Sequence, residues 1–103
     1  MVGKYKVITL CGSTKFKEDF FREQKRLSLE GNIVISLGMF GHSGDGDVIT
    51  EDIKTMLDDM HKRKIDMADE IFVINKNGYI GDSTRSEIEY AKSTNKKVNY
   101  MEK

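Results

Sequence analysis

The stretch GDSTRSEIEYA, residues 81–91, gathers side chains that can do chemistry directly before and inside a predicted helix. Ser83 and Thr84 supply hydroxyl groups, while Asp82 and Glu87 supply carboxylates. We expect Glu87 in the first turn of this helix, where the helix dipole favours its ionised form. An ionised carboxylate in such a place can act as a base or as a nucleophile.

The same residues also have a purely structural interpretation. Thr84-Arg85-Ser86-Glu87 matches a capping box, in which the Glu87 side chain bonds to the Thr84 amide. A capping box explains both Thr84 and Glu87 without any substrate. On the residues alone, cap and nucleophile both stay open.

Gly12-Ser13-Thr14-Lys15 is the second candidate, because it follows an apolar run and leads into a predicted helix. Amide groups at a helix start, two hydroxyls and an ammonium group can together hold an anion. The motif is shorter than a Walker A loop or a complete G-x-G-x-x-G. The alternative is a tight strand-to-helix turn with a Ser or Thr cap.

The cysteine and the long loop of the chain are two further candidates for chemistry. Cys11 ends an apolar strand and could act as a nucleophile, but the sequence places no histidine to activate it, which favours a small buried hydrophobe. His42, Asp45 and Asp47 lie in GHSGDGD, but the other ligands of a calcium loop are missing. We therefore predict no metal and no cofactor, and expect the loop 37–49 to close over a ligand.

Hydrophobic periodicity predicts the elements that must position these residues. Apolar runs rich in β-branched residues predict strands over 6–11, 32–36, 70–75 and 97–101. Helical spacings predict helices over 15–30, 50–68 and 83–95. We expect Thr50 to cap the second helix and Gly31 to end the first. The predicted apolar stripes are Phe16, Phe20, Gln24 and Leu27 in the first helix, and Ile53, Met56, Leu57, Met60, Lys64, Met67 and Ala68 in the second.

Strands that alternate with helices predict parallel pairing with right-handed crossovers. The sequence therefore predicts one α/β domain over 1–103, a three-layer sandwich with a flavodoxin-like or Rossmann-like sheet of four to five parallel strands. Ligands of such sheets bind at the carboxyl ends of the strands, where the strand order reverses. Three predicted loops leave those ends, at 12–14, 37–49 and 76–82.

The composition excludes several classes of function. Seventeen basic residues balance seventeen acidic ones in 103 residues, so no overall field recruits a nucleic acid polymer or an anionic membrane. The chain has no long apolar run, which predicts no membrane span. Its single cysteine cannot form an internal disulfide and fits a reducing compartment, so we expect a cytoplasmic protein.

Three segments in order resemble one known family. A first strand ends in Gly-Ser, here ITLCGS at 8–13, and an Ala-Asp pair enters an apolar strand, here MADEIFVIN at 67–75. A glycine-containing loop then leads to Glu-aliphatic-x-x-Ala, here Glu87-Ile88-Glu89-Tyr90-Ala91. The chain resembles the nucleoside 2-deoxyribosyltransferase-like superfamily, which includes nucleotide N-glycosidases.

The resemblance implies a role for each candidate residue. Glu87 would attack the anomeric carbon of the sugar and expel the base, and the glycosyl ester would pass to another base or to water. The loop after the first strand and the turn before the glutamate would hold a 5′-phosphate. These positions correspond to Gly12, Ser13, Thr14 and Lys15, and to Ser83 and Thr84, with Asp82 near the place of a sugar-contacting residue.

His61 departs from the family pattern, which often has an acid eight residues before the aspartate of the Ala-Asp pair. Counting back from Asp69 reaches His61, a different titratable group. In an unbroken helix from Thr50, His61 would lie about 15 Å along the axis and away from the strand ends. We therefore expect it to reach the site only if the helix breaks near 58–60. The alternative is a partly buried helix residue.

The leading prediction is an enzyme that cleaves or exchanges the N-glycosidic bond of a nucleoside or nucleoside monophosphate. Two alternatives stay open: a non-catalytic nucleotide-binding module of the same fold, and a small protein whose loops bind a protein partner. The expected partner of the enzyme or module is a nucleoside or nucleotide. A homo-oligomer is also left open.

Overall fold

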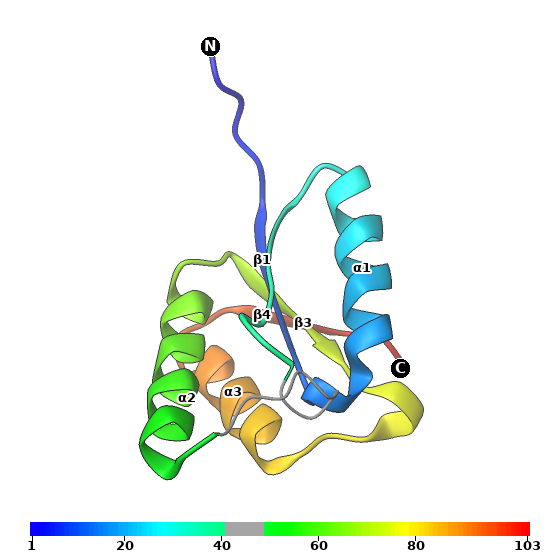
Figure 1. The fold of residues 1–103 in the computed structure, drawn as a ribbon. Helices are drawn as coiled ribbons and strands as arrows, with labels where there is room; N and C mark the ends of the chain where they lie inside the picture. The colour runs from blue at the N-terminus through cyan, green and yellow to red at the C-terminus, as the bar shows by residue number, and fades with distance from the viewer. Residues whose placement is uncertain (41–48) are drawn as a thin grey trace.

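The apolar runs of the sequence form a parallel β-sheet (Figure 1). The computed structural model describes residues 1–40 and 49–103, and within these ranges four strands pair in the order β2-β1-β3-β4. Their bounds are Val7–Gly12 for β1, Ile33–Ile35 for β2, Glu70–Ile74 for β3 and Lys97–Tyr100 for β4. The prediction of a parallel α/β sheet with a flavodoxin-like or Rossmann-like order is confirmed.

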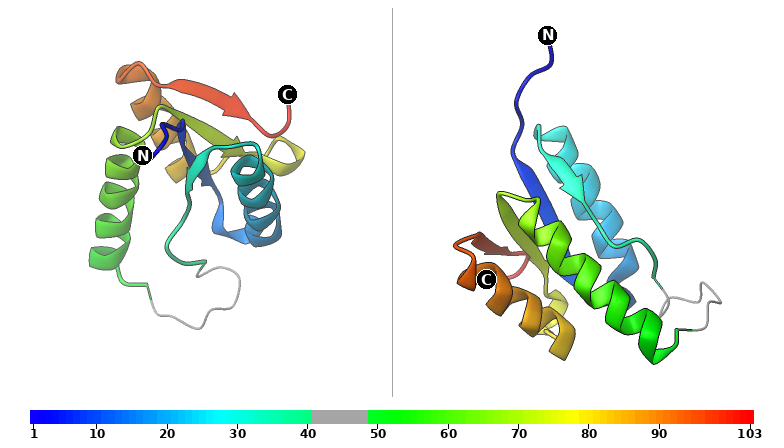
Figure 2. Two further views of the ribbon diagram at one scale, coloured as in Figure 1. Left: turned by 90° about the horizontal axis from the view of Figure 1, so that it is seen from above. Right: turned by 90° about the vertical axis from the view of Figure 1, so that its left-hand side faces the viewer.

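Helices cover both faces of this sheet, as the views in Figure 2 show. A short 3₁₀ turn, η1 (Thr14–Phe16), leads into α1 (Lys17–Leu29), which packs on one face. The opposite face carries α2 (Glu51–Asp66) and α3 (Asp82–Ser93). A second 3₁₀ turn, η3 (Lys76–Gly78), lies between β3 and α3. Together these elements make the predicted three layers.

Two apolar cores lie on opposite sides of the sheet because side chains alternate along each strand. On β1, Ile8 and Leu10 pack toward Phe20 of α1, whereas Cys11 packs toward Ile65 of α2. The two faces of β3 divide in the same way. The central strands are thus buried on both faces, which is why they read as continuous apolar runs.

Both predicted helix ends are confirmed. Thr50 caps α2, because its hydroxyl accepts a hydrogen bond from the Ile53 amide at 3.2 Å. Gly31 follows the end of α1 with φ 98°, and the amide of Asn32 reaches back to the Leu27 carbonyl at 3.1 Å. This is a Schellman ending, in which the left-handed position favours glycine.

The predicted helical stripes are only partly correct. On α1, Gln24 is exposed and its neighbour Glu23 is buried instead, with Arg26 donating to its carboxylate at 2.8 Å. On α2, Met56 and Met60 are exposed, and His61 faces the sheet. In each helix the buried residue is the neighbour of the predicted one. The prediction failed because polar residues occupy positions on the buried face, and the spacing of apolar residues alone cannot reveal them.

The strand order reverses between β1 and β3. From β1 the chain moves outward to β2, then returns across the sheet to β3 and continues to β4. The loops that leave β1 and β3 therefore diverge above the carboxyl edge and leave room for a ligand between them. Within 1–40 and 49–103, no helix combines the length and apolar character that a membrane crossing requires.

Candidate functional site

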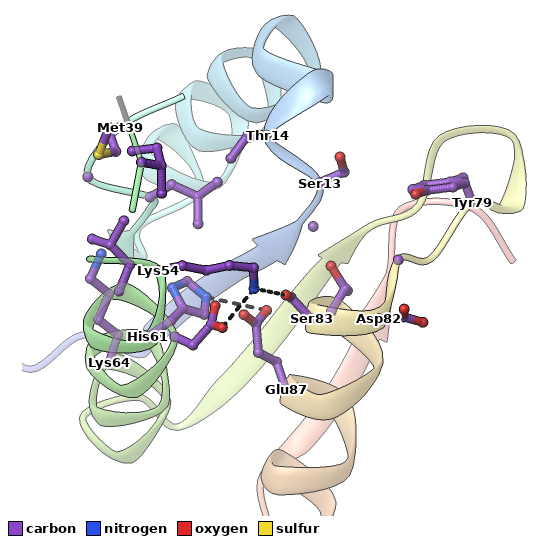
Figure 3. A pocket seen from close by; sticks show the side chains of 18 residues that line it. Ser13, Thr14, Met39, Lys54, His61, Lys64, Tyr79, Asp82, Ser83 and Glu87 are labelled. Carbon is purple, nitrogen blue, oxygen red and sulfur yellow. Dashed lines mark hydrogen bonds and ion pairs between the residues drawn. The ribbon is translucent and has the colours of Figure 1, made fainter. Parts of the chain in front are cut away.

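A cavity of about 760 Å³ opens at the carboxyl ends of β1 and β3, where the strand order reverses (Figure 3). This volume lies within the range of small-molecule sites in proteins. The loop after β1, one side of α2 and the first turns of α3 form its walls. The predicted place of the ligand site therefore coincides with a real hollow.

The structure brings together all but one of the predicted site residues. The cavity is lined by Gly12, Ser13, Thr14, His61, Asp82, Ser83, Thr84 and Glu87. Lys15 is the exception, because its ammonium group lies 3.5 Å from the centre of the Tyr79 ring and does not line the cavity. Asp82 reaches only the rim, where its exposed carboxylate lies 3.4 Å from Arg85.

The capping-box prediction is wrong. Helix α3 begins at Asp82 with Gly81 as its N-cap, three residues earlier than a cap at Thr84 would require, and no side-chain cap bond forms. Glu87 is consequently the sixth residue of the helix rather than a first-turn residue. The helix end does not need this carboxylate, which is 8% exposed and points into the cavity (Figure 3).

The expectation that His61 stays away from the site unless α2 breaks is also wrong. Helix α2 is continuous from Glu51 to Asp66, yet His61 Nε2 lies 3.8 Å from Glu87 Oε1. Figure 2 shows the reason, since the beginning of α2 extends beyond the ends of β1 and β3. The third turn of the helix, and not its first, is therefore level with the strand ends.

Cys11 has a histidine neighbour that the sequence did not reveal. Its Sγ atom lies 3.5 Å from His61 Nε2, across 50 residues of chain. Because alternation along β1 turns Cys11 toward α2, the thiol meets the buried side of that helix. Its predicted burial is confirmed, but its neighbours are polar as well as apolar.

Burial shifts the two titratable groups at the cavity floor in opposite directions. Desolvation raises the pKa of Glu87 to about 7, although the nearby Cys11 thiol opposes this shift. Desolvation, followed by the charge of Lys64, lowers the pKa of His61 to about 4. The expected fully ionised Glu87 is thus replaced by a carboxyl that titrates near neutral pH beside an uncharged imidazole.

The loop after β1 brings the hydroxyl-bearing residues Ser13 and Thr14 to the cavity. Ser13 caps η1 through a 3.3 Å bond from the Lys15 amide to its hydroxyl. Gly12 has φ 156°, and a Cβ at this position would lie 2.8 Å from the Ile74 carbonyl oxygen. Only glycine therefore lets the loop cross so close to β3 and present Ser13 to the cavity.

Sequence reasoning missed several residues that line the cavity. Lys54 Nζ lies 3.0 Å from Asp58 and 3.4 Å from Ser83, so it links α2 to α3 across the opening. Lys54, Asp58 and His61 share one side of α2, and their spacing of four and three was the available signal. The other missed residues are Leu57, Lys64, Tyr79 and Gly81.

The predicted closing loop 37–49 falls mostly outside the described residues. Its residues 41–48, with His42, Asp45 and Asp47, are among those not described. The described residues of this loop that line the cavity are Leu37, Gly38, Met39 and Ile49.

A comparison with protein-family models finds no match for this chain, and a comparison with curated protein sequences also finds none. The resemblance to the nucleoside 2-deoxyribosyltransferase-like superfamily consequently rests on the residues of this chain alone.

Proposed function

We propose that this protein cleaves or exchanges the N-glycosidic bond of a nucleoside or nucleoside monophosphate, with Glu87 as the nucleophile. The observation that carries the proposal is the position of Glu87, a buried carboxyl that the helix end does not require. It faces a cavity at the carboxyl edge of a parallel sheet. Buried polar groups without a structural task are costly, which favours a chemical role.

The proposed reaction has two displacements. A Glu87 oxygen bonds to the anomeric carbon while the bond to the base nitrogen breaks, and the base leaves with the electron pair and takes up a proton from water. In hydrolysis, water then attacks the anomeric carbon of the ester and restores the Glu87 carboxylate. His61, 3.8 Å away and uncharged, is the group that accepts the proton of this water. In exchange, a second base replaces the water.

The opening of the cavity suits a phosphate or sugar. Ser13 and Ser83 place hydroxyls at the opening, and Lys54 places an ammonium group 3.4 Å from Ser83. The cation expected from Lys15 is thus supplied by Lys54 in this proposal. An anionic 5′-phosphate near these groups would direct the anomeric carbon toward Glu87.

Substitution of Glu87 by glutamine tests the proposal. Base release from nucleosides and their 5′-monophosphates is measured by chromatography for the wild-type chain, Glu87→Gln and the control Glu89→Gln. Glutamine keeps the shape but cannot form the ester, so release should fall by orders of magnitude in Glu87→Gln. Glu89 is exposed on another side of the same helix, so its variant should match the wild type.

The pH dependence gives a second readout of the same proposal. Because the nucleophile must be ionised, release by the wild-type chain should increase as the pH rises through about 7. Equal release of base by the wild-type chain and by Glu87→Gln would exclude Glu87 as the nucleophile.

A non-catalytic nucleotide-binding module is the second candidate, favoured by the same hydroxyl-lined opening. Nucleotides that raise the melting temperature while no base is released from any substrate would support the module instead.

A further inference from the structure

Three side chains with different metal-binding donors meet at the floor of the cavity. Cys11 comes from β1, His61 from α2 and Glu87 from α3. Their sulfur, nitrogen and oxygen atoms all lie within 4.8 Å of one another, and all three residues are buried. Three separate elements of the fold thus converge on one point.

The spacing of these atoms resembles that of ligands around a tetrahedral ion. Tetrahedral zinc holds a sulfur and a nitrogen ligand about 3.5 Å apart, and a nitrogen and an oxygen ligand about 3.3 Å apart. The distance from Cys11 Sγ to His61 Nε2 is 3.5 Å, and that from His61 Nε2 to Glu87 Oε1 is 3.8 Å. A small rotation of the Glu87 side chain would bring its oxygen to the distances expected between ligands of one ion.

The surroundings support such a set of ligands. The backbone of Leu10 hydrogen-bonds to the His61 ring, while Nε2 is the nitrogen that faces Cys11 and Glu87. Histidine ligands of metals are commonly fixed in this way by a bond to the ring. His61 and Glu87 also line the cavity, so a fourth coordination position would open toward a ligand or water.

The local charge fits a divalent cation of borderline softness. A cation that displaced the protons of the Cys11 thiol and the Glu87 carboxyl would meet two negative charges, which balance one divalent ion. The positive charges of Lys54, Lys62 and Lys64 favour the ionised form of the Glu87 carboxyl, whereas the negative charge of Asp58 disfavours it. A thiolate and an imidazole select zinc or cobalt over magnesium or calcium, which require oxygen ligands.

We propose that Cys11, His61 and Glu87 form a binding site for a zinc-class divalent cation whose fourth position faces the cavity. This site differs from the sequence prediction of no metal. A further consequence rests on the proposed function: a bound ion would occupy the carboxylate that attacks the sugar, and would therefore inhibit base release.

Cobalt(II) titration of the metal-free full chain tests the site directly. Cys11 is the single cysteine, so a thiolate-to-cobalt absorption band can come from this position alone. We expect this band to saturate at one equivalent of cobalt and to disappear when zinc is added. Tetrahedral coordination should also give the cobalt ion intense visible absorption. No thiolate band at one equivalent would overturn the proposal.

Variants separate the three ligands from nearby charges. Cys11→Ser should abolish the thiolate band, with Cys11→Ala as the second variant if serine impairs folding, which circular dichroism would reveal. His61→Gln and Glu87→Gln should each weaken cobalt binding at least about tenfold. Glu89→Gln is the matched control and should bind as the wild type does. Unchanged affinity in His61→Gln would also overturn the proposal.

Measuring base release with and without zinc separates the metal-site proposal from the proposed function. If base release is observed, zinc should suppress it and magnesium should not, and release that is insensitive to saturating zinc would exclude the inhibitory consequence. The cobalt band requires no turnover. A band without base release would therefore refute the enzyme alone, and base release without a band would refute the metal site alone.

Discussion

At the scale of single residues, Glu87 and His61 show how burial changes chemistry. The pKa of Glu87 rises to about 7 and that of His61 falls to about 4, in both cases chiefly because burial disfavours the charged form. At neutral pH His61 is therefore uncharged and Glu87 is partly ionised, with Nε2 of His61 and Oε1 of Glu87 3.8 Å apart. A carboxyl poised near neutrality can be ionised for attack at modest cost, which suits the proposed nucleophile.

Ser13 is the residue on which the proposed phosphate position is tested. If its hydroxyl contacts a phosphate, nucleoside monophosphates should raise the melting temperature more than the matching nucleosides do. Ser13→Ala should remove this difference and leave the fold intact, since loss of the 3.3 Å cap bond costs about 1 kcal/mol.

Ser28→Ala is the control for this experiment, because Ser28 is an exposed serine on α1 that does not line the cavity. Its variant should keep the preference for monophosphates. Identical shifts from nucleosides and monophosphates in the wild-type chain would contradict a phosphate position at Ser13.

At the scale of the elements, the close approach of β1 to β3 decides how the loop enters the cavity. Gly12 pairs with Ile74 at the end of the β1–β3 ladder, and Phe20 of α1 packs beneath it. The three elements leave no space for a side chain at this point. The loop that carries Ser13 is thus fixed by packing rather than by its own hydrogen bonds alone.

Gly12→Ala should destabilise the protein because the added Cβ would lie 2.8 Å from the Ile74 carbonyl oxygen and 3.2 Å from Phe20 Cζ. Overpacking together with an unfavourable φ should cost about 1–3 kcal/mol. For a domain of this size, the melting temperature should fall by roughly 5–20 °C in a thermal unfolding experiment.

The control is Gly38→Ala, since a Cβ at Gly38 would meet no atom within 4 Å. Its melting temperature should stay close to that of the wild type. Equal melting temperatures for Gly12→Ala and Gly38→Ala would show that the loop can relax without loss.

At the scale of the whole molecule, the buried pair links stability to pH. The folded-state pKa of Glu87 is raised, so its contribution to stability is present below about 4.5 and is lost as the pH rises through about 7. The folded-state pKa of His61 is lowered, so its contribution is present above about 6.5 and is lost as the pH falls toward about 4. The two effects oppose each other between these limits.

Glu87→Gln should therefore gain stability relative to the wild type as the pH is raised from 5 to 8, by about 2–3 kcal/mol in the free energy of unfolding. Urea denaturation at several pH values measures this difference. His61→Gln is the matched comparison and should show the opposite trend, gaining relative to the wild type as the pH is lowered. A difference between Glu87→Gln and the wild type that does not change with pH would contradict a raised pKa for Glu87.

The sequence by itself determined the architecture. Apolar runs such as 70–75 and helical spacing such as Phe20 to Leu27 are local patterns, and each kind of element must bury its apolar side in its own period. Alternation of the elements then restricted the sheet to parallel pairing, and the loops after β1 and β3 could be assigned to one edge. Most residues of the candidate site follow from this reasoning, because they lie in those loops or directly after them.

Only the tertiary structure decided how the floor of the cavity is assembled. The start of α3 at Asp82 removed Glu87 from its predicted capping role, and the position of α2 beyond the strand ends brought His61 to Cys11 and Glu87. These outcomes depend on the rotation and axial position of whole helices against the sheet. Packing sets such quantities through contacts between residues some 50 positions apart, and no local pattern of residue types encodes them.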